Sequence, residues 1–288
     1  MKHRAGTMPS KAAMLRLAKA RGWVCDMDGT LVLGDRHNKE LQPLPRAIDF
    51  IEWIASRDLP FVLYTNGTTR TPRQYAETLQ GIGFRLDERH LMTPASSAVD
   101  VFVRKGYSRV MVVGGDGLKI PLSEAGIEPV APAGKAKVDA VLVGWFREFT
   151  VNEIEAAVYA VWDGAQLYSC SQSLFFASAD GKTLGTSRLI SAAISDLTGT
   201  RIHIVGKPSI DAIRSAARRL QLKTTELAVM GDDPSLEIVM AHRGKSLAIA
   251  VHSGIGGAAE VRKLPAAQRP HIAVDNVAEL LALCRTLH

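Results

Sequence analysis

Val24-Cys25-Asp26-Met27-Asp28-Gly29-Thr30 is the stretch on which the interpretation of the whole sequence depends. It reads as a short apolar strand that ends in two aspartates one residue apart and then in a glycine turn. Carboxylates at i and i+2 of an extended segment point to the same side, so Asp26 and Asp28 should lie close together. Such a pair repels, and one carboxylate would stay protonated unless a cation such as Mg²⁺ neutralised it. With the cation, one aspartate could attack phosphorus and the other could handle the leaving group's proton.

Three further strand ends distinguish this hypothesis from an ordinary Asp-Gly turn, which explains the first stretch equally well on its own. In open parallel α/β sheets, ligands bind in the crevice outside the carboxyl ends of the strands. Polar clusters that follow several strands are therefore expected to meet at one place. The three clusters are Thr65-Asn66-Gly67 after residues 62–64, Gly206-Lys207-Pro208 after residues 204–205, and Gly231-Asp232-Asp233 after residues 229–230.

The second and third of these four clusters carry groups that suit a phosphoryl group. Its transition state needs donors for three equatorial oxygens. Thr65 supplies a hydroxyl, Asn66 and Gly67 supply backbone amides, and Lys207 supplies a cation.

The first and last clusters carry carboxylates that suit magnesium. Mg²⁺ prefers oxygen ligands, which Asp26, Asp232 and a backbone carbonyl would provide together with water. Each cluster taken singly is explained more simply by turn or helix-capping chemistry. Independent turns, however, would not be expected to supply a nucleophile, an acid, phosphate donors and metal ligands in one crevice.

Apolar runs and helical patterns alternate along the chain. β-branched runs without polar alternation are typical of parallel strands buried on both faces. The alternation predicts an α/β fold built on a doubly wound parallel sheet. The expected strands are residues 23–25, 61–64, 110–113, 140–143, 166–170, 202–205, 227–230, 247–251 and 272–274, and the expected helices are 45–56, 72–81, 152–162, 187–198, 210–220 and 278–287.

Composition limits the remaining classes of protein. The 288 residues, 47% of them hydrophobic, can bury a sizeable core, and no run approaches the roughly 18 consecutive apolar residues of a membrane span. The net charge of +6 suits an anionic ligand, but the basic residues are scattered and aromatic residues are only 6%, which argues against nucleic acid as a partner. Cys25, Cys170 and Cys284 fit neither a disulfide framework nor a zinc site, which favours a cytoplasmic location.

Two glycine-containing segments are interpreted as turns. Gly114-Gly115-Asp116-Gly117 follows an expected strand and opens a helix, but it lacks the third glycine of a dinucleotide-binding fingerprint. Gly181-Lys182-Thr183 lacks the upstream glycine of a Walker A loop and is expected to be a hairpin turn.

The four clusters in this order resemble the four motifs of the haloacid dehalogenase-like hydrolases. The Thr-Asn of the second motif, the Gly-Lys-Pro of the third and the insertion of about 140 residues between them are similar to subfamily IIA, which contains NagD-like and 4-nitrophenylphosphatase-like phosphatases. The resemblance extends from Trp23 to the C-terminus. It implies a Rossmann-like core with an inserted α/β cap.

The resemblance also implies roles for individual residues. Asp26 would be the nucleophile that forms an aspartyl-phosphate, and Asp28 the general acid and later the base. Lys207 would hold the nucleophile and the phosphate. Mg²⁺ would be bound by Asp26, the carbonyl of Asp28 and Asp232. The phosphoryl oxygens would be bound by Thr65, Asn66 and Gly67.

Two departures from the family pattern concern the metal and the substrate. Glu237 stands where relatives usually have aspartate. Together with Asp233 it is expected not to bind the metal directly but to act through a hydrogen bond or a metal-bound water. In the insertion, Ser171-Gln172-Ser173 replaces the usual Thr-Asn followed by Asp. Because the Gln172 amide can read a substrate hydroxyl, we expect Gln172 to contact the substrate, the alternative being that this segment only completes a cap strand.

The sequence therefore predicts a core domain formed by residues 1–105 and 200–288 and a cap formed by residues 106–199. A cap over the crevice excludes water and bulky substrates, so the expected substrate is a small phosphate monoester of a sugar, polyol, nucleotide or pyridoxal. A homo-oligomer formed through the cap is a further expectation. The alternatives are a phosphotransferase or phosphomutase of the same fold and a non-catalytic protein that binds phosphorylated metabolites.

Overall fold

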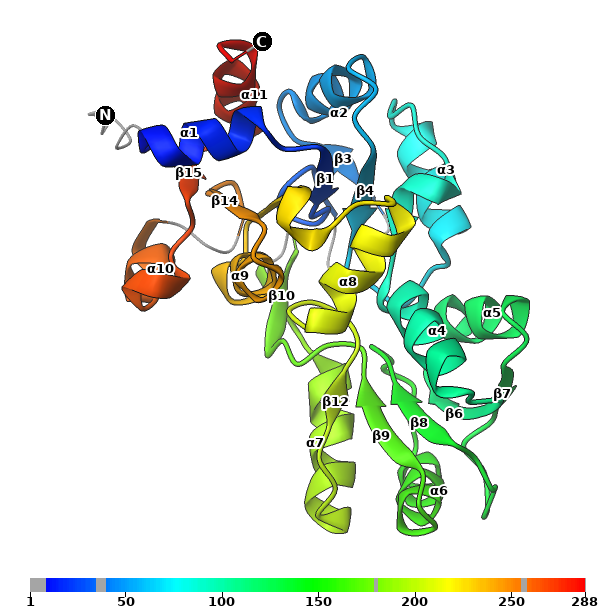
Figure 1. Cartoon of the computed structure of the whole chain (residues 1–288). Helices are drawn as coiled ribbons and strands as arrows, with labels where there is room; N and C mark the ends of the chain where they lie inside the picture. Colours follow the sequence, from blue (N-terminus) through cyan, green and yellow to red (C-terminus); the bar gives the residue numbers. More distant parts are fainter. Residues whose placement is uncertain (1–8, 35–39, 179–180, 255–257, 288) are drawn as a thin grey trace.

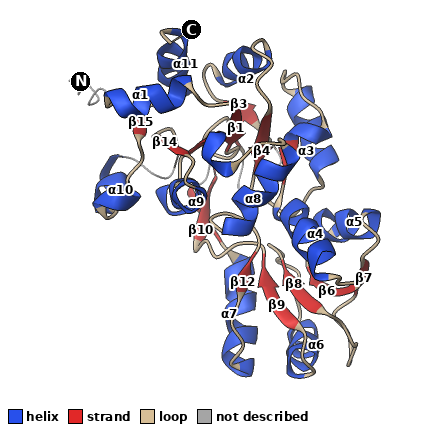
Figure 2. Ribbon diagram, viewed as in Figure 1, coloured by secondary structure: helices blue, strands red, loops and turns tan. Residues whose placement is uncertain are grey.

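The apolar runs form two parallel sheets, each with helices on both faces (Figure 1, Figure 2). The computed structural model describes residues 9–34, 40–178, 181–254 and 258–287. All of the strands and helices expected above are found within about two residues of their predicted ends. The prediction of an α/β fold with a doubly wound parallel sheet is confirmed.

The six-stranded sheet forms the core domain. Counted along the chain, its strands take the order 3-2-1-4-5-6, which places the first strand, β1, beside the fourth, β13. This is the topological switch point at which ligands bind in such sheets. The strands are β1 (Gly22–Cys25), β4 (Phe61–Tyr64), β5 (Leu91–Met92), β13 (Leu227–Gly231), β14 (Leu247–Val251) and β15 (Ile272–Val274).

Alternation along the core strands divides their apolar side chains between two helical layers. On β1, Trp23 and Cys25 pack on one face, while Val24 packs on the other. The first layer contains α1 (Lys11–Ala18), α2 (Ala47–Ala55), α3 (Pro72–Gly81) and α11 (Val277–Arg285), and the second contains α8 (Ile210–Arg219), α9 (Val239–Gly244) and α10 (Ala258–Lys263).

The five-stranded sheet belongs to the cap, which lies below the core in Figure 1. All of its strand pairs are parallel, in the order β12-β9-β8-β6-β7. Helices α4 and α5 cover one face and α6 and α7 the other. The elements are α4 (Pro94–Lys105), β6 (Arg109–Val113), α5 (Asp116–Glu124), β7 (Glu128–Val130), β8 (Ala140–Val143), α6 (Val151–Trp162), β9 (Gln166–Ser169), α7 (Thr186–Thr198) and β12 (His203–Ile204).

The packing bears on where the cap begins and ends. Helix α4 contributes Ala98 and Phe102 to the apolar cluster under the cap sheet, although it also contacts α8 of the core. At the other end, β12 pairs with β9 of the cap. We therefore propose a cap of residues 94–205, wider at both ends than the expected 106–199.

Short elements that apolar periodicity did not predict complete the fold. Two are antiparallel pairs, β2 (Val32–Leu33) with β3 (Gln42–Pro43) and β10 (Phe175–Ser178) with β11 (Gly181–Leu184). The segment Gly181-Lys182-Thr183 is thus the second strand of a hairpin, whose turn lies outside the described residues. Single helical turns lie at Glu88–His90, Thr224–Glu226, Pro234–Ile238 and Ala266–Gln268. Within the described parts of the chain, no helix is both long and apolar enough to span a membrane.

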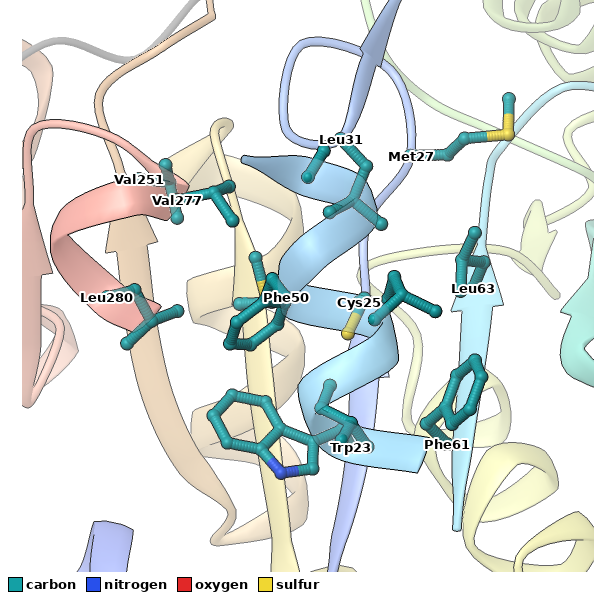
Figure 3. Packing of buried hydrophobic residues seen from close by; sticks show 14 of the residues in the cluster. Trp23, Cys25, Met27, Leu31, Phe50, Phe61, Leu63, Val251, Val277 and Leu280 are labelled. Atoms are coloured by element: carbon teal, nitrogen blue, oxygen red, sulfur yellow. The ribbon is translucent and has the colours of Figure 1, made fainter. Parts of the chain in front are cut away.

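The packing of the core cluster shown in Figure 3 leads to a specific prediction about stability. Phe50 of α2 is fully buried and meets the Trp23 ring edge-on, with 5.2 Å between ring centroids. Phe50→Ala should therefore lower the free energy of unfolding by about 3–5 kcal/mol, because a cavity remains that the rigid sheet cannot close. Urea denaturation measures this change. Leu189→Ala on α7 is the control, since Leu189 is 49% exposed and should cost no more than about 0.5 kcal/mol. Equal costs for the two variants would contradict the packing described.

Candidate active site

The four clusters meet at the carboxyl ends of the core strands. Asp26 follows β1 and Asp232 follows β13, so the two carboxylates stand on either side of the switch point. Both are at least nine-tenths buried, as are Thr65 after β4 and Lys207 after β12. The structure thus brings together residues that are up to about 200 positions apart in the sequence.

A buried lysine lies between two buried carboxylates at the centre of the site. The Nζ atom of Lys207 donates to Oδ1 of Asp26 and lies 2.7 Å from Oε1 of Glu237. Burial acts to raise the pKa of the Glu237 carboxyl, and the Lys207 ammonium acts to lower it. Burial acts to lower the pKa of Lys207, but attraction to Asp26 and Glu237 outweighs it and raises that pKa. Lys207 is therefore held as an ammonium ion against the carboxylate of Asp26.

An acidic group suited to a divalent cation surrounds Asp26. Ligand oxygens of Asp26, Asp232 and Glu237 all lie within 4.8 Å of one another. The hydroxyl of Thr30 donates to Asp26 Oδ2 at 2.8 Å and lies 3.5 Å from Asp232 Oδ1, which fixes the two carboxylates relative to each other. Gly29 is needed in the turn because its φ is +81° and a Cβ atom there would lie 2.7 Å from Asp232 Oδ2. This set of hard oxygen donors fits Mg²⁺.

The Thr65-Asn66-Gly67 loop is braced against the catalytic candidates. Thr65 Oγ1 donates to Asp28 Oδ2 at 2.7 Å and accepts from the Gly67 amide at 2.9 Å. The Asn66 side chain makes two hydrogen bonds to the backbone of Lys207. It accepts from the N–H at 2.9 Å and donates to the carbonyl at 3.0 Å. The loop therefore orients Asp28 and Lys207, in addition to presenting amides for phosphoryl oxygens.

Two glycines permit the close approach of these segments. A Cβ atom at Gly206 would lie 2.1 Å from the carbonyl oxygen of Cys170 and 2.7 Å from Asn66 Oδ1. At Gly231, a Cβ atom would lie 2.1 Å from Cγ of Glu237. The longer Glu237 side chain thus folds over the Cα of Gly231 on its way to Lys207. Neither position has room for a Cβ atom, so both residues must be glycine.

The site opens into a cavity of about 110 Å³ between the core and the cap. Asp26, Asp28, Lys207 and Asp232 line its core side together with the phosphate-binding candidates. The cap contributes Trp145, Ser171, Ser173, Phe175, Gly185 and Ser187.

Gln172, which was expected to contact the substrate, is not brought to this cavity. Its Nε2 atom donates to Ser191 Oγ on α7 at 2.9 Å and to the Ser171 carbonyl at 3.3 Å. Its amide is therefore used to fix the segment to α7, while its neighbours Ser171 and Ser173 line the cavity.

Asp233 and Glu237, which were expected to act together, make different contacts. Asp233 Oδ1 accepts from the Ser235 amide at 2.8 Å and from its hydroxyl at 2.6 Å, so this side chain caps the helical turn Pro234–Ile238. Glu237 reaches Lys207 directly, and its Oε2 accepts from the Asp233 amide at 3.1 Å. This turn is π-helical, an irregularity often found at functional sites.

Three residues that build the site were not predicted from the sequence motifs. Thr30 completes the first motif, and its hydroxyl fixes Asp26. Thr68 and Trp145 join core to cap, because the Trp145 amide donates to Thr68 Oγ1 at 2.8 Å. Trp145 follows strand β8 closely, so the rule that strand ends carry the site could have indicated it.

The segment at Gly114–117, which leads from strand β6 into helix α5, is also part of this junction. Helix α5 begins at Asp116, directly after the segment's first two glycines. A Cβ atom at Gly117 would lie 2.4 Å from the Thr68 carbonyl oxygen, so this glycine allows α5 to dock on the loop that follows Gly67.

Comparison with known proteins agrees with this arrangement. Residues 23–128 match the haloacid dehalogenase-like hydrolase family, and residues 204–280 match a HAD-hydrolase-like family. Ribonucleotide monophosphatase NagD of Escherichia coli (strain K12) is 28% identical over 262 residues, which cover 89% of this chain and 96% of that protein. 5′-Nucleotidase YutF of Bacillus subtilis (strain 168) is 25% identical over 236 residues, covering 82% and 88%.

Solved structures show the same fold. NagD from E. coli K-12 superposes with a TM-score of 0.79 at 25% identity, covering 91% of this chain and 98% of that one. A glycerol phosphate phosphatase of Mycobacterium tuberculosis, solved in complex with magnesium, gives 0.80 at 23% identity, covering 94% and 78%. The chain belongs to the haloacid dehalogenase-like hydrolases. Within them it groups with the NagD-like phosphatases.

The buried position of Lys207 yields a stability prediction. Lys207→Met should destabilise the protein by about 3–5 kcal/mol, because the carboxylates of Asp26 and Glu237 would lose their shared cation while remaining buried. Urea denaturation in the presence of a chelator measures the loss. The exposed Lys19→Met is the control and should have little effect. A Lys207→Met protein as stable as wild type would show that this lysine is not needed to hold the carboxylates together.

Proposed function

We propose that this protein is a Mg²⁺-dependent phosphatase that hydrolyses a small phosphate monoester through a phosphorylated Asp26. The observation that carries the proposal is the contact of Lys207 with Asp26, beside an Asp28 that Thr65 holds. A nucleophile, its cationic partner and a second carboxylic acid thus line the same cavity. The cap closes over this cavity, which limits the substrate to a small ester.

The roles of the chain's own residues follow from these contacts. A carboxylate oxygen of Asp26 forms a bond to phosphorus as the bond to the ester oxygen breaks. Asp28 gives its proton to that departing oxygen, so the product leaves as an alcohol. Asp28 then takes a proton from water as the water oxygen bonds to phosphorus and the bond from phosphorus to Asp26 breaks, which releases phosphate and restores the Asp26 carboxylate and the protonated Asp28. The hydrogen bond from Thr65 orients Asp28 for both transfers.

Lys207 and the loop after β4 stabilise negative charge in both steps. The Lys207 ammonium lies against Asp26 and so reaches the oxygens of a phosphoryl group attached there. Amides of Asn66 and Gly67 would donate to the same oxygens. The Asn66 side chain fixes the Lys207 backbone, which keeps the ammonium in place without reorganisation during the reaction.

The proposed metal ligands are Asp26, the carbonyl of Asp28, and Asp232, with Glu237 beside them. When bound, Mg²⁺ would neutralise the repulsion among these carboxylates and stabilise charge on the phosphoryl oxygens. The proximity of three carboxylates supports this assignment. The solved glycerol phosphate phosphatase with the same fold contains magnesium.

We also propose a reducing, cytoplasmic location. The three cysteines are buried free thiols, and burial raises the pKa of Cys25, Cys170 and Cys284, with that of Cys284 at about 12. Such thiols pack as small apolar side chains and are inert.

Substitution of the nucleophile tests the proposed function most simply. Asp26→Asn should abolish release of phosphate from a panel of phosphate monoesters assayed with Mg²⁺, because the amide has the same shape but cannot attack phosphorus. Far-ultraviolet circular dichroism would show that the variant is folded, and mass spectrometry would exclude deamidation. Retention of more than a small fraction of wild-type activity would rule out Asp26 as the nucleophile.

A second pair of variants separates metal chemistry from proton transfer. Asp232→Ala should weaken both the affinity for Mg²⁺ and the activity, since it removes a proposed ligand. Asp28→Asn should slow hydrolysis of an alkyl phosphate at least about tenfold more than that of 4-nitrophenyl phosphate, whose leaving group needs little protonation. Steady-state kinetics at varied Mg²⁺ concentration give both quantities. Equal losses for the two esters with Asp28→Asn would argue against Asp28 as the acid.

A further inference from the structure

The cap presents aromatic and small uncharged side chains to the cavity. Of the described residues that line the cavity, all charged ones belong to the core, and the cap supplies Trp145 and Phe175 with serines and a glycine. A leaving group held between core and cap therefore meets no cap cation among the described residues. A second anionic group on the substrate would lose its water there without compensation.

The Ser171 hydroxyl is already used within the protein. Ser171 Oγ accepts from the Ser173 amide at 3.1 Å and bonds the Ser173 hydroxyl at 3.1 Å. It also lies 3.4 Å from Nδ2 of Asn66. This hydroxyl joins the cap to the Thr65-Asn66-Gly67 loop, and Trp145 and Phe175 are the aromatic residues that the described part of the cap contributes to the cavity.

Trp145 is held at both ends. Its backbone amide donates to Oγ1 of Thr68, which is fully buried and follows the Thr65-Asn66-Gly67 loop. Its indole Nε1 donates to the Leu184 carbonyl at the end of strand β11, 2.9 Å away. The backbone is thus tied to the core and the ring to the cap hairpin, so the indole forms a fixed wall of the cavity.

We propose that Trp145 is a specificity-determining residue, whose indole selects phosphate esters with an uncharged leaving group that offers a flat apolar face. The inference rests on the proposed phosphatase function of the same cavity. A rigid ring gains stacking and apolar contact with a flat group at little entropic cost. A leaving group that carries a carboxylate gains no such contact and must be desolvated against the ring.

The test compares three esters that share the phosphate and differ in the leaving group, namely benzyl, ethyl and carboxymethyl phosphate. We expect wild-type kcat/KM with Mg²⁺ to decrease in that order. Trp145→Ala should reduce the ratio of benzyl to ethyl about tenfold, because the apolar wall is lost. Trp145→Phe should retain most of the ratio. Trp162→Ala is the matched control, since Trp162 is a cap tryptophan on α6 that is 62% exposed and does not line the cavity.

The outcomes separate this inference from the proposed function. Failure of the wild type to hydrolyse any of the three esters would contradict the phosphatase proposal itself. Hydrolysis with no preference for benzyl, a preference for the carboxymethyl ester, or a benzyl-to-ethyl ratio unchanged in Trp145→Ala would overturn the role of Trp145. Loss of the ratio in Trp145→Ala together with its retention in Trp145→Phe and Trp162→Ala would support it.

Discussion

The contact of one buried ammonium with two buried carboxylates is the interaction on which the rest of the site depends. Lys207 arrives from the segment that leaves the cap, Asp26 from the first core strand and Glu237 from the turn after the fourth. Burying these charges separately would cost far more than burying them together, because each would lose its hydration without a partner. Folding must therefore bring three distant parts of the chain together before the site exists.

The strand order of the core explains why the chemistry gathers at this point. The chain leaves β1 in one direction along the sheet and returns to its other side through β13, so the loops after these strands diverge and leave a crevice. Asp26 and Asp232 occupy its two edges. The insertion between β5 and α8 then places a second sheet over the crevice, and contacts such as that of Thr68 with Trp145 join the two parts.

Much of the core site could be predicted from sequence, because parallel strands bring their carboxyl ends to one edge and residues such as Asp26 and Asp232 follow core strands directly. The cap was harder to predict. In an irregular segment the direction of a side chain depends on its tertiary neighbours, and Gln172 turns to Ser191 on a helix that periodicity alone could not position. Close backbone contacts, such as that of α5 at Gly117, depend equally on distant segments.

The central claim is that a carboxylate of the chain accepts the phosphoryl group before water does. Two successive displacements at phosphorus restore its configuration, whereas direct attack by water inverts it. A phosphorothioate ester made chiral at phosphorus with sulfur and two oxygen isotopes, and hydrolysed in water carrying the third oxygen isotope, would leave thiophosphate whose configuration nuclear magnetic resonance can determine. The account predicts net retention of configuration, and inversion would contradict it.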